Sequence, residues 1–188
     1  MRKFFSLLTF TVLLAWGCNP CEFDCQNGGD CNDGTCECPE EYEGADCSIH
    51  KDPLGIKFLT IEASNIPALN PDNESWDADG SGPDIVVAYR RNTYYGDLTP
   101  VTTDFNGSSM AHTGYVSLVN RGDNPLYEYY IGVFDKEEGS GVDSFELIGE
   151  YRFDISELAR SSNYGTELHF EAPGLPTIDL VVEYWYED

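Results

Sequence analysis

Basic residues are scarce in this sequence, and long apolar runs are missing beyond its first residues. The 188-residue chain has 10 Lys and Arg against 34 Asp and Glu, which gives a net charge of −24. A surface of this charge repels nucleic acid and anionic membranes, because phosphate binding requires clustered Lys and Arg. After residue 17 no apolar segment has the roughly 20 residues that a membrane-spanning helix needs. Nucleic acid is therefore excluded as a partner.

Histidine is rarer still, and cysteine is missing from most of the chain. Of the three histidines, His50 lies in the expected linker, and His112 and His169 have no nearby Ser, Cys or Asp in a recognisable catalytic pattern. No cysteine follows Cys47. Carboxylates that could form a glycosidase pair are abundant, but among 34 acids chance pairs are inevitable. By the usual criteria of nucleophile, base and oxyanion donor, we do not expect an enzyme.

The first residues have the composition of a secretory leader. Arg2 and Lys3 precede an uncharged, mostly apolar run over residues 4–16, and small Gly17 follows it. The run is too short to cross a bilayer but has the length of a signal-peptide core. We therefore expect residues 1–17 to be a signal peptide. Without Arg2 and Lys3 the net charge falls from −24 to −26.

The first cysteine follows this leader directly. Residues 14–18 read Leu-Ala-Trp-Gly-Cys, and they resemble a bacterial lipobox. The resemblance implies a diacylglycerol on Cys18, a lipidated N-terminus at residues 18–20, and a chain anchored to the bacterial cell envelope, at the outer membrane or cell surface. An acyl chain anchors because each buried CH₂ contributes about 0.8 kcal/mol. The alternative is ordinary cleavage after Gly17, which would give a secreted protein.

Six further cysteines are concentrated in a short segment, at residues 21, 25, 31, 36, 38 and 47. Six cysteines can close into three disulfides, which persist only in an oxidising compartment, and spacing alone allows fifteen connectivities. Zinc is disfavoured because zinc cysteines usually come in pairs two residues apart, and none of these do. Since the segment has little apolar surface to bury, covalent closure must replace a core.

The end of this segment reads Cys36-x-Cys38-x5-Gly44-x2-Cys47, and its middle reads Gln-Asn-Gly-Gly-Asp-Cys at residues 26–31. Residues 21–47 thereby resemble an EGF-like module. Calcium-binding members carry acids just before the first cysteine, where this chain has Asn19 and Pro20, so we expect a spacer without calcium. Residues 48–53 read as a linker. The resemblance implies the disulfides Cys21–Cys31, Cys25–Cys36 and Cys38–Cys47.

Residues 54–188 have a different composition. Short runs rich in β-branched and aromatic residues alternate with Gly, Pro, Asn and Asp clusters, a pattern typical of an antiparallel β-sandwich. We expect the many aromatic residues to fill the core rather than to form a sugar-binding platform. A helical turn is expected at 155–160, opened by Asp154 or Ser156. The expected strands are 56–63, 84–90, 115–119, 127–134, 145–153, 167–170 and 178–186.

Two loops of this sandwich, residues 70–84 and 134–150, crowd several carboxylates together. Carboxylates that close repel one another, so such loops either splay into water or hold a cation. Calcium is the obvious candidate, because it accepts six to eight oxygens in a flexible geometry. An EF-hand is excluded, since its twelfth residue would be Val86 rather than Glu.

The strands around these loops carry a further resemblance. Residues 56–63, the run 129–137 (Tyr-Tyr-Ile-Gly-Val-Phe-Asp-Lys-Glu) and the turn 146–150 (Glu-Leu-Ile-Gly-Glu) resemble a C2 domain, a calcium- and phospholipid-binding β-sandwich. Candidate tips that would contact a membrane or partner are Trp76, Val142 and Phe145. The calcium ligands that the resemblance implies are Asp79 or Asp77, Asp84, Asp135, Glu137, and Glu146 or Asp143.

The sequence therefore predicts a mainly β chain, a small disulfide-rich EGF-like module followed by an antiparallel C2-like sandwich. We expect a surface lipoprotein that binds calcium and mediates adhesion to, or recognition of, an extracellular protein or glycan. Two alternatives stay open: a metal-free secreted structural or matrix component, and a glycan-binding accessory module.

Overall fold

The fold was determined as a computed structural model, and it describes residue 21 and residues 24–119, 128–137 and 144–186. The described residues are mainly antiparallel β-strand, as predicted, with a disulfide-rich segment before the sandwich. The chain divides into two compact units, 1–50 and 51–188. Among the described residues, no helix is long and apolar enough to cross a membrane.

The first unit consists of two small hairpins. Strands β1 (Asp30–Asn32) and β2 (Thr35–Glu37) pair through a two-residue turn, in which Asp33 (φ 48°) and Gly34 (φ 86°) both have positive φ. An Asp-Gly pair is the preferred sequence for such a turn. Strands β3 (Tyr42–Glu43) and β4 (Ile49–His50) form the second hairpin. The folded unit therefore continues to His50, into residues expected to be linker.

Disulfides hold this unit together in place of a core. The described cysteines form three bonds, Cys21–Cys31, Cys25–Cys36 and Cys38–Cys47, which is the pairing that the EGF resemblance implies. Packing around them is tight: a Cβ at Gly29 would lie 2.7 Å from the sulfur of Cys47. Glycine at that position lets the backbone approach the disulfide.

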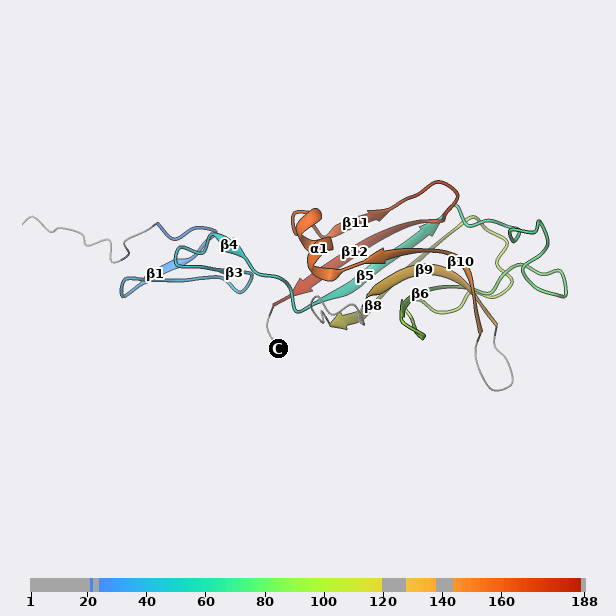
Figure 1. The fold of residues 1–188 in the computed structure, drawn as a ribbon, viewed down its shortest axis with the longest axis horizontal. Helices are drawn as coiled ribbons and strands as arrows, with labels where there is room; N and C mark the ends of the chain where they lie inside the picture. Colours follow the sequence, from blue (N-terminus) through green and yellow to red (C-terminus); the bar gives the residue numbers. More distant parts are fainter. Residues whose placement is uncertain (1–20, 22–23, 120–127, 138–143, 187–188) are drawn as a thin grey trace, which may run out of the picture. The chain divides into compact units, whose positions relative to one another are not determined.

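The second unit is a sandwich of two four-stranded antiparallel sheets (Figure 1). The sequence did not predict the edge strand at residues 94–97 or the first half, residues 109–114, of a second edge strand. The reason is that residues 92–114 lack a strong apolar pattern. The two sheets have the strand orders β10-β9-β6-β7 and β11-β12-β5-β8. The strands are β5 (Gly55–Ser64), β6 (Ile85–Arg91), β7 (Tyr94–Asp97), β8 (Ser109–Val119), β9 (Tyr129–Glu137), β10 (Ser144–Phe153), β11 (Glu167–Phe170) and β12 (Thr177–Trp185).

The core lies between the two sheets and draws on both. Ile56, Phe58 and Ile61 of β5 pack there against Ile131 and Val133 of β9. Phe58 and Ile61 are three residues apart yet both are buried, because the register with β8 shifts between Phe58 and Thr60. Such a bulge moves the following residues to the other face of the strand.

A second apolar cluster lies on the opposite face of the β10-β9-β6-β7 sheet. Phe134 belongs to this cluster, whereas its neighbour Val133 belongs to the core, because successive strand residues point to opposite faces. Tyr95 and Phe145 cover the cluster, with their rings stacked at 4.5 Å. The Phe145 ring is thus packed on the sheet rather than projecting as a tip. Phe58, Tyr129, Phe134 and Phe153 are buried in packed interiors, as expected, whereas Tyr94 is 57% exposed.

One short helix, α1 (Ile155–Ser161), connects β10 to β11. Asp154 caps it, since its Oδ1 accepts a hydrogen bond from the amide of Glu157 at 2.8 Å. The predicted helical turn is therefore confirmed. Of the two candidate N-caps, Asp154 and Ser156, Asp154 is the one that caps the helix.

Candidate functional site

The two acidic loops meet because β6 begins where β9 ends. Ile85 lies opposite Asp135 in this antiparallel pair, so Asp84 lies beside the end of β9. The amide of Asp84 donates a hydrogen bond to Oδ1 of Asp135 at 2.7 Å. The amide of Lys136 donates to the carbonyl oxygen of Asp84 at 2.8 Å. Asp84 is thereby joined to the end of β9 by one hydrogen bond to a side chain and one between backbone groups.

Asp135 is the most unusual member of the site. It alternates along β9 with Ile131 and Val133, so its side chain points to the same face as the core, and its exposed fraction is 0%. Its second oxygen, Oδ2, is buried and has no hydrogen-bond partner among the described residues. Burial raises the pKa of this carboxyl, and the charges of Asp77, Asp84 and Glu146 raise it further. The hydrogen bond from Asp84 acts in the opposite direction.

Asp77, from the first loop, belongs to both compact groups of carboxylates at this site. One of its oxygens lies within 4.8 Å of oxygens of Asp135 and Glu137, and an equally compact group joins Asp77 to Asp84 and Asp104. We call these five residues, Asp77, Asp84, Asp104, Asp135 and Glu137, the acidic cluster. A hydrogen bond with Asp77 raises the pKa of Glu137, as do burial and the neighbouring charges. Without a cation, the cluster thus favours retention of a proton.

The residue before Asp77 fixes the course of the first loop. Trp76 is only 8% exposed, and its indole Nε1 donates to the carbonyl oxygen of Pro67 at 3.1 Å. The expectation that Trp76 projects from the loop as a tip is therefore not met, since its ring anchors the loop from within. Farther along, Gly82 runs so close to another segment that a Cβ there would lie 2.3 Å from the oxygen of Phe105.

Four of the predicted ligands converge in the acidic cluster: Asp77, Asp84, Asp135 and Glu137. Of the alternatives Asp77 and Asp79, the structure brings in Asp77. Asp79 is exposed, and its Oδ1 accepts from the amide of Ser81 at 2.9 Å instead.

The remaining predicted residues are placed differently. Glu146 lies opposite Asp135 in the β9–β10 register and raises its pKa, yet it is exposed and outside both compact groups. Val142 and Asp143 lie outside the described residues.

Asp104 is the member that sequence reasoning missed. The connection between β7 and β8 passes beside β6, where Thr102 pairs with Ile85. This contact brings Asp104 to the site, and its amide donates to Oδ1 of Asp84 at 2.9 Å. Residues 92–124 do not follow the C2 pattern, so no motif singled out this aspartate.

The chemistry of the acidic cluster fits calcium. All its side-chain donors are carboxylate oxygens, the hard ligands that calcium prefers, and they come from loops and strand ends that allow a flexible geometry. The buried Oδ2 of Asp135 requires a proton or a cation, because an unpartnered buried charge is costly. Softer metals would select sulfur or imidazole ligands instead.

A scan against protein-family models gives no match, and a search of curated proteins gives none either. The functional assignment therefore depends on the geometry and charge of the site itself.

Proposed function

We propose that this protein binds calcium through the acidic cluster at one end of its sandwich, and that the calcium-bound loops recognise an extracellular protein or glycan. The observation that carries the calcium proposal is Asp135. Its carboxylate is fully buried, one oxygen is held by the amide of Asp84, and the other has no partner among the described residues. Calcium would supply the positive charge that this oxygen and its carboxylate neighbours lack.

The resemblance to C2 domains supports the same proposal. It implies ligands from a first loop and from the end of the strand that carries Asp135. In the folded chain Asp77 and Asp84 come from the first segment, and Asp135 and Glu137 from the second. Convergence of four positions that were named from sequence favours a C2-like calcium site.

The net charge of the chain limits the kinds of partner that the protein can bind. At −24 for the whole chain, the surface repels nucleic acid and acidic lipid, and calcium neutralises only the loops it binds. A protein or glycan partner that contacts these loops is compatible with such a surface. In the absence of calcium, repulsion among the carboxylates would keep the loops from their binding geometry.

We also propose that a lipid on Cys18 anchors the protein to a bacterial cell envelope, with the EGF-like module as spacer. Six of the seven cysteines are paired in the three disulfides, which leaves Cys18 for this modification. Detergent phase partitioning of the wild type and a Cys18→Ser variant tests the anchor. The wild type should enter the detergent phase and the variant the aqueous phase. Equal partitioning of the two would favour the secreted alternative.

Calorimetric titration with calcium tests the metal. We expect the wild type to bind with a dissociation constant in the micromolar to millimolar range, as sensor and extracellular calcium sites do. Asp135→Asn should abolish the binding heat. Asp79→Asn is the matched control, because it makes the same change in charge on an aspartate of the first loop that lies outside the acidic cluster.

Two outcomes would count against this assignment. Absence of binding in the wild type would favour the metal-free structural alternative. Equal loss of binding in Asp79→Asn and Asp135→Asn would mean that overall charge, and not the cluster, attracts the ion.

A further inference from the structure

The proposed calcium ligand Asp77 lies in the middle of a long connection. Residues 65–84 join β5 to β6 without a helix or strand of their own. Asp77 is nevertheless the residue that both compact groups of carboxylates share. Ordering a loop on binding costs affinity, so a ligand on such a connection binds best when its position is already fixed. The contacts on either side of Asp77 therefore bear on calcium affinity.

Trp76 fixes the chain immediately before Asp77. Its side chain is buried, and its indole Nε1 donates a hydrogen bond to the carbonyl oxygen of Pro67 at 3.1 Å. The two residues are nine positions apart, so this bond closes the stretch between them into a loop. A buried indole N–H usually has such a partner, and loss of the partner would leave a donor unsatisfied.

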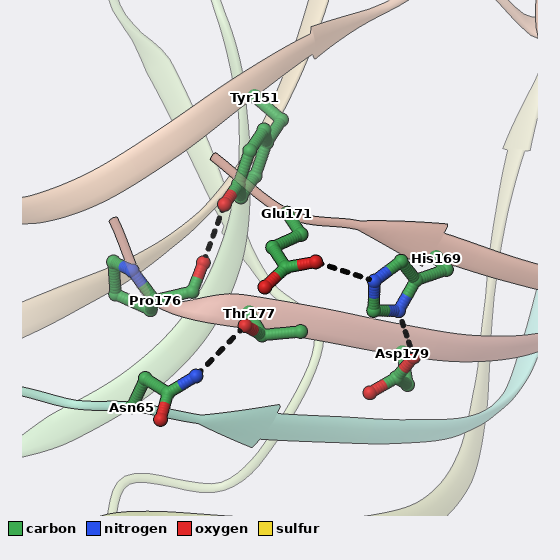
Figure 2. Close-up of polar contacts among 7 residues, drawn as sticks. All are labelled: Asn65, Tyr151, His169, Glu171, Pro176, Thr177 and Asp179. Carbon is green, nitrogen blue, oxygen red and sulfur yellow. Dashed lines mark hydrogen bonds and ion pairs between the residues drawn. The ribbon is translucent and has the colours of Figure 1, made fainter. Parts of the chain in front are cut away.

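The segment that carries this carbonyl acceptor is itself fixed to the sandwich. Ile66, the residue before the acceptor, is buried in the core, and its amide donates to the carbonyl oxygen of Ser108 at 3.1 Å. One residue earlier, Nδ2 of Asn65 donates to Oγ1 of Thr177 on β12 at 3.0 Å. Figure 2 shows the Asn65 side chain directed toward Thr177. The indole is therefore bonded to a segment that the core and the sheet hold in place.

A tight turn fixes the chain after Asp77. The amide of Gly80 donates to the carbonyl oxygen of Asp77 at 3.0 Å, and Gly80 has a φ of 89°. Glycine adopts this left-handed conformation without strain. The hydroxyl of Ser81 lies 2.8 Å from Oδ2 of Asp77 and 2.6 Å from Oδ1 of Asp79. Asp77 is thus held from both sides, by Trp76 before it and by this turn after it.

We propose that Trp76 is a positioning residue of the calcium site, and that its hydrogen bond to Pro67 sets calcium affinity by fixing Asp77. The inference rests on the calcium function proposed above, and it names a residue that cannot itself bind the ion. An indole offers only an N–H donor, whereas calcium binds oxygen. Trp76 therefore acts only through the residue beside it.

Calorimetric titration of Trp76→Phe with calcium tests the proposal, in the full chain with its disulfides intact. Phenylalanine keeps an aromatic ring but has no N–H, so the bond to Pro67 is lost. We expect Trp76→Phe to bind calcium about three- to tenfold more weakly than the wild type, the effect of one hydrogen bond. Circular dichroism of the calcium-free variant at the titration temperature should match the wild type. A merely structural role would lower the melting temperature but leave the affinity of the folded protein unchanged.

Trp185→Phe is the matched control. Trp185 lies on β12 opposite Gly55, at the end of β5 away from the connection to β6, so this variant should bind calcium as the wild type does. Equal affinity of the wild type and Trp76→Phe, or an equal loss in the two variants, would overturn the inference and leave the calcium site standing. A wild type that binds no calcium would overturn the calcium proposal as well.

The wild type gives a second readout, which does not depend on how the variant folds. In a chelator, the indole N–H proton of Trp76 should exchange slowly with water in nuclear magnetic resonance spectra, because it is buried and hydrogen-bonded. Its signal should shift when calcium is added. Fast exchange of this proton would overturn the proposal, since an N–H that is open to water does not hold the chain beside Asp77.

Discussion

The amide of Asp84 donates a hydrogen bond over 2.7 Å to Oδ1 of the buried Asp135, so one oxygen of that carboxylate is satisfied by the backbone of a neighbouring strand. The carboxylate is thereby held in place, its Oδ2 has no hydrogen-bond partner among the described residues, and one of its oxygens lies within 4.8 Å of oxygens of Asp77 and Glu137. An oxygen held among like charges is well placed to bind a cation, and without a cation its negative charge is energetically unfavourable. This arrangement predicts how the stability of the calcium-free protein depends on the charge of Asp135.

Asp135→Asn should stabilise the calcium-free protein. The folded-state pKa of Asp135 is raised, so its charge destabilises the fold at pH values above that pKa, and protonation removes this cost as the pH falls. Asparagine keeps an acceptor for the Asp84 amide but carries no charge. In a chelator at neutral pH, we expect the melting temperature of the variant to exceed that of the wild type by a few degrees.

The same melting experiment has a calcium arm. Calcium should raise the melting temperature of the wild type, since a ligand that binds only the folded state stabilises it, and should leave Asp135→Asn unchanged. Asp79→Asn should behave as the wild type in both arms. A lower melting temperature of Asp135→Asn in chelator would contradict the account of Asp135 as a charge that destabilises the calcium-free fold.

Phe134 should matter for stability although it lies on the outer face of a sheet. Its ring is buried and packs edge-to-face against Tyr95 at 5.4 Å. Replacing a buried phenylalanine by alanine typically costs about 3–5 kcal/mol, and we expect Phe134→Ala to lower the free energy of unfolding by that amount in denaturant titration. Leu147→Ala is the control: Leu147 is 49% exposed, so the change should stay within about 0.5 kcal/mol. Similar losses in the two variants would show that the second apolar cluster is not packed as described.

Two ion pairs on the same sheet should differ in strength. Arg90 binds Glu150 through two nitrogens, one at 2.9 Å, and its guanidinium lies 4.0 Å from the centre of the Tyr130 ring. Both side chains are largely buried, at 22% and 18% exposed, whereas Arg152 and Glu128 are 63% and 39% exposed. Double-mutant cycles should give a coupling of about 1–2 kcal/mol for the first pair and under about 0.5 kcal/mol for the second. Equal couplings would mean that burial and stacking add nothing to the first pair.

The pKa of His169 should lie above its ordinary value and should fall when Asp179 is changed. Asp179 is the larger cause of the raised pKa and Glu171 the smaller. A histidine with a raised folded-state pKa stabilises the fold below its unfolded pKa, and this contribution is lost as the pH rises through the folded pKa. In metal-free protein, nuclear magnetic resonance titration should show a lower pKa in Asp179→Asn than in the wild type. An unchanged pKa in that variant would mean that the two side chains are apart in solution.

Much of the fold was predictable from local patterns. The apolar runs predicted most strands, and the cysteine spacing, through its resemblance to EGF-like modules, predicted the three disulfides. Strand β7 escaped notice because its four residues, Tyr-Tyr-Gly-Asp, show no clear alternation. Its position depends on pairing with β6 rather than on local preference.

The sites were predictable only where a motif marked them. Asp84 and Asp135 stood next to strands that resemble C2 strands, and the structure brings them together. Asp104 reaches the acidic cluster because Thr102 pairs with Ile85, a long-range contact that composition does not encode. His169 lacked a recognisable partner in sequence for the same reason, since Asp179 is brought opposite it by the register of β11 and β12. Trp76 was predicted to be an exposed tip, but its indole nitrogen donates a hydrogen bond to the carbonyl oxygen of Pro67.

Anomalous diffraction from crystals grown with calcium would test the central claim most directly. We expect a calcium peak within about 2.3–2.6 Å of Oδ2 of Asp135, with oxygens of Asp77 and Glu137 among its other ligands. Crystals of Asp135→Asn grown in the same way should lack the peak. Wild-type crystals with no peak at the acidic cluster, at a calcium concentration that saturates binding in solution, would contradict the account.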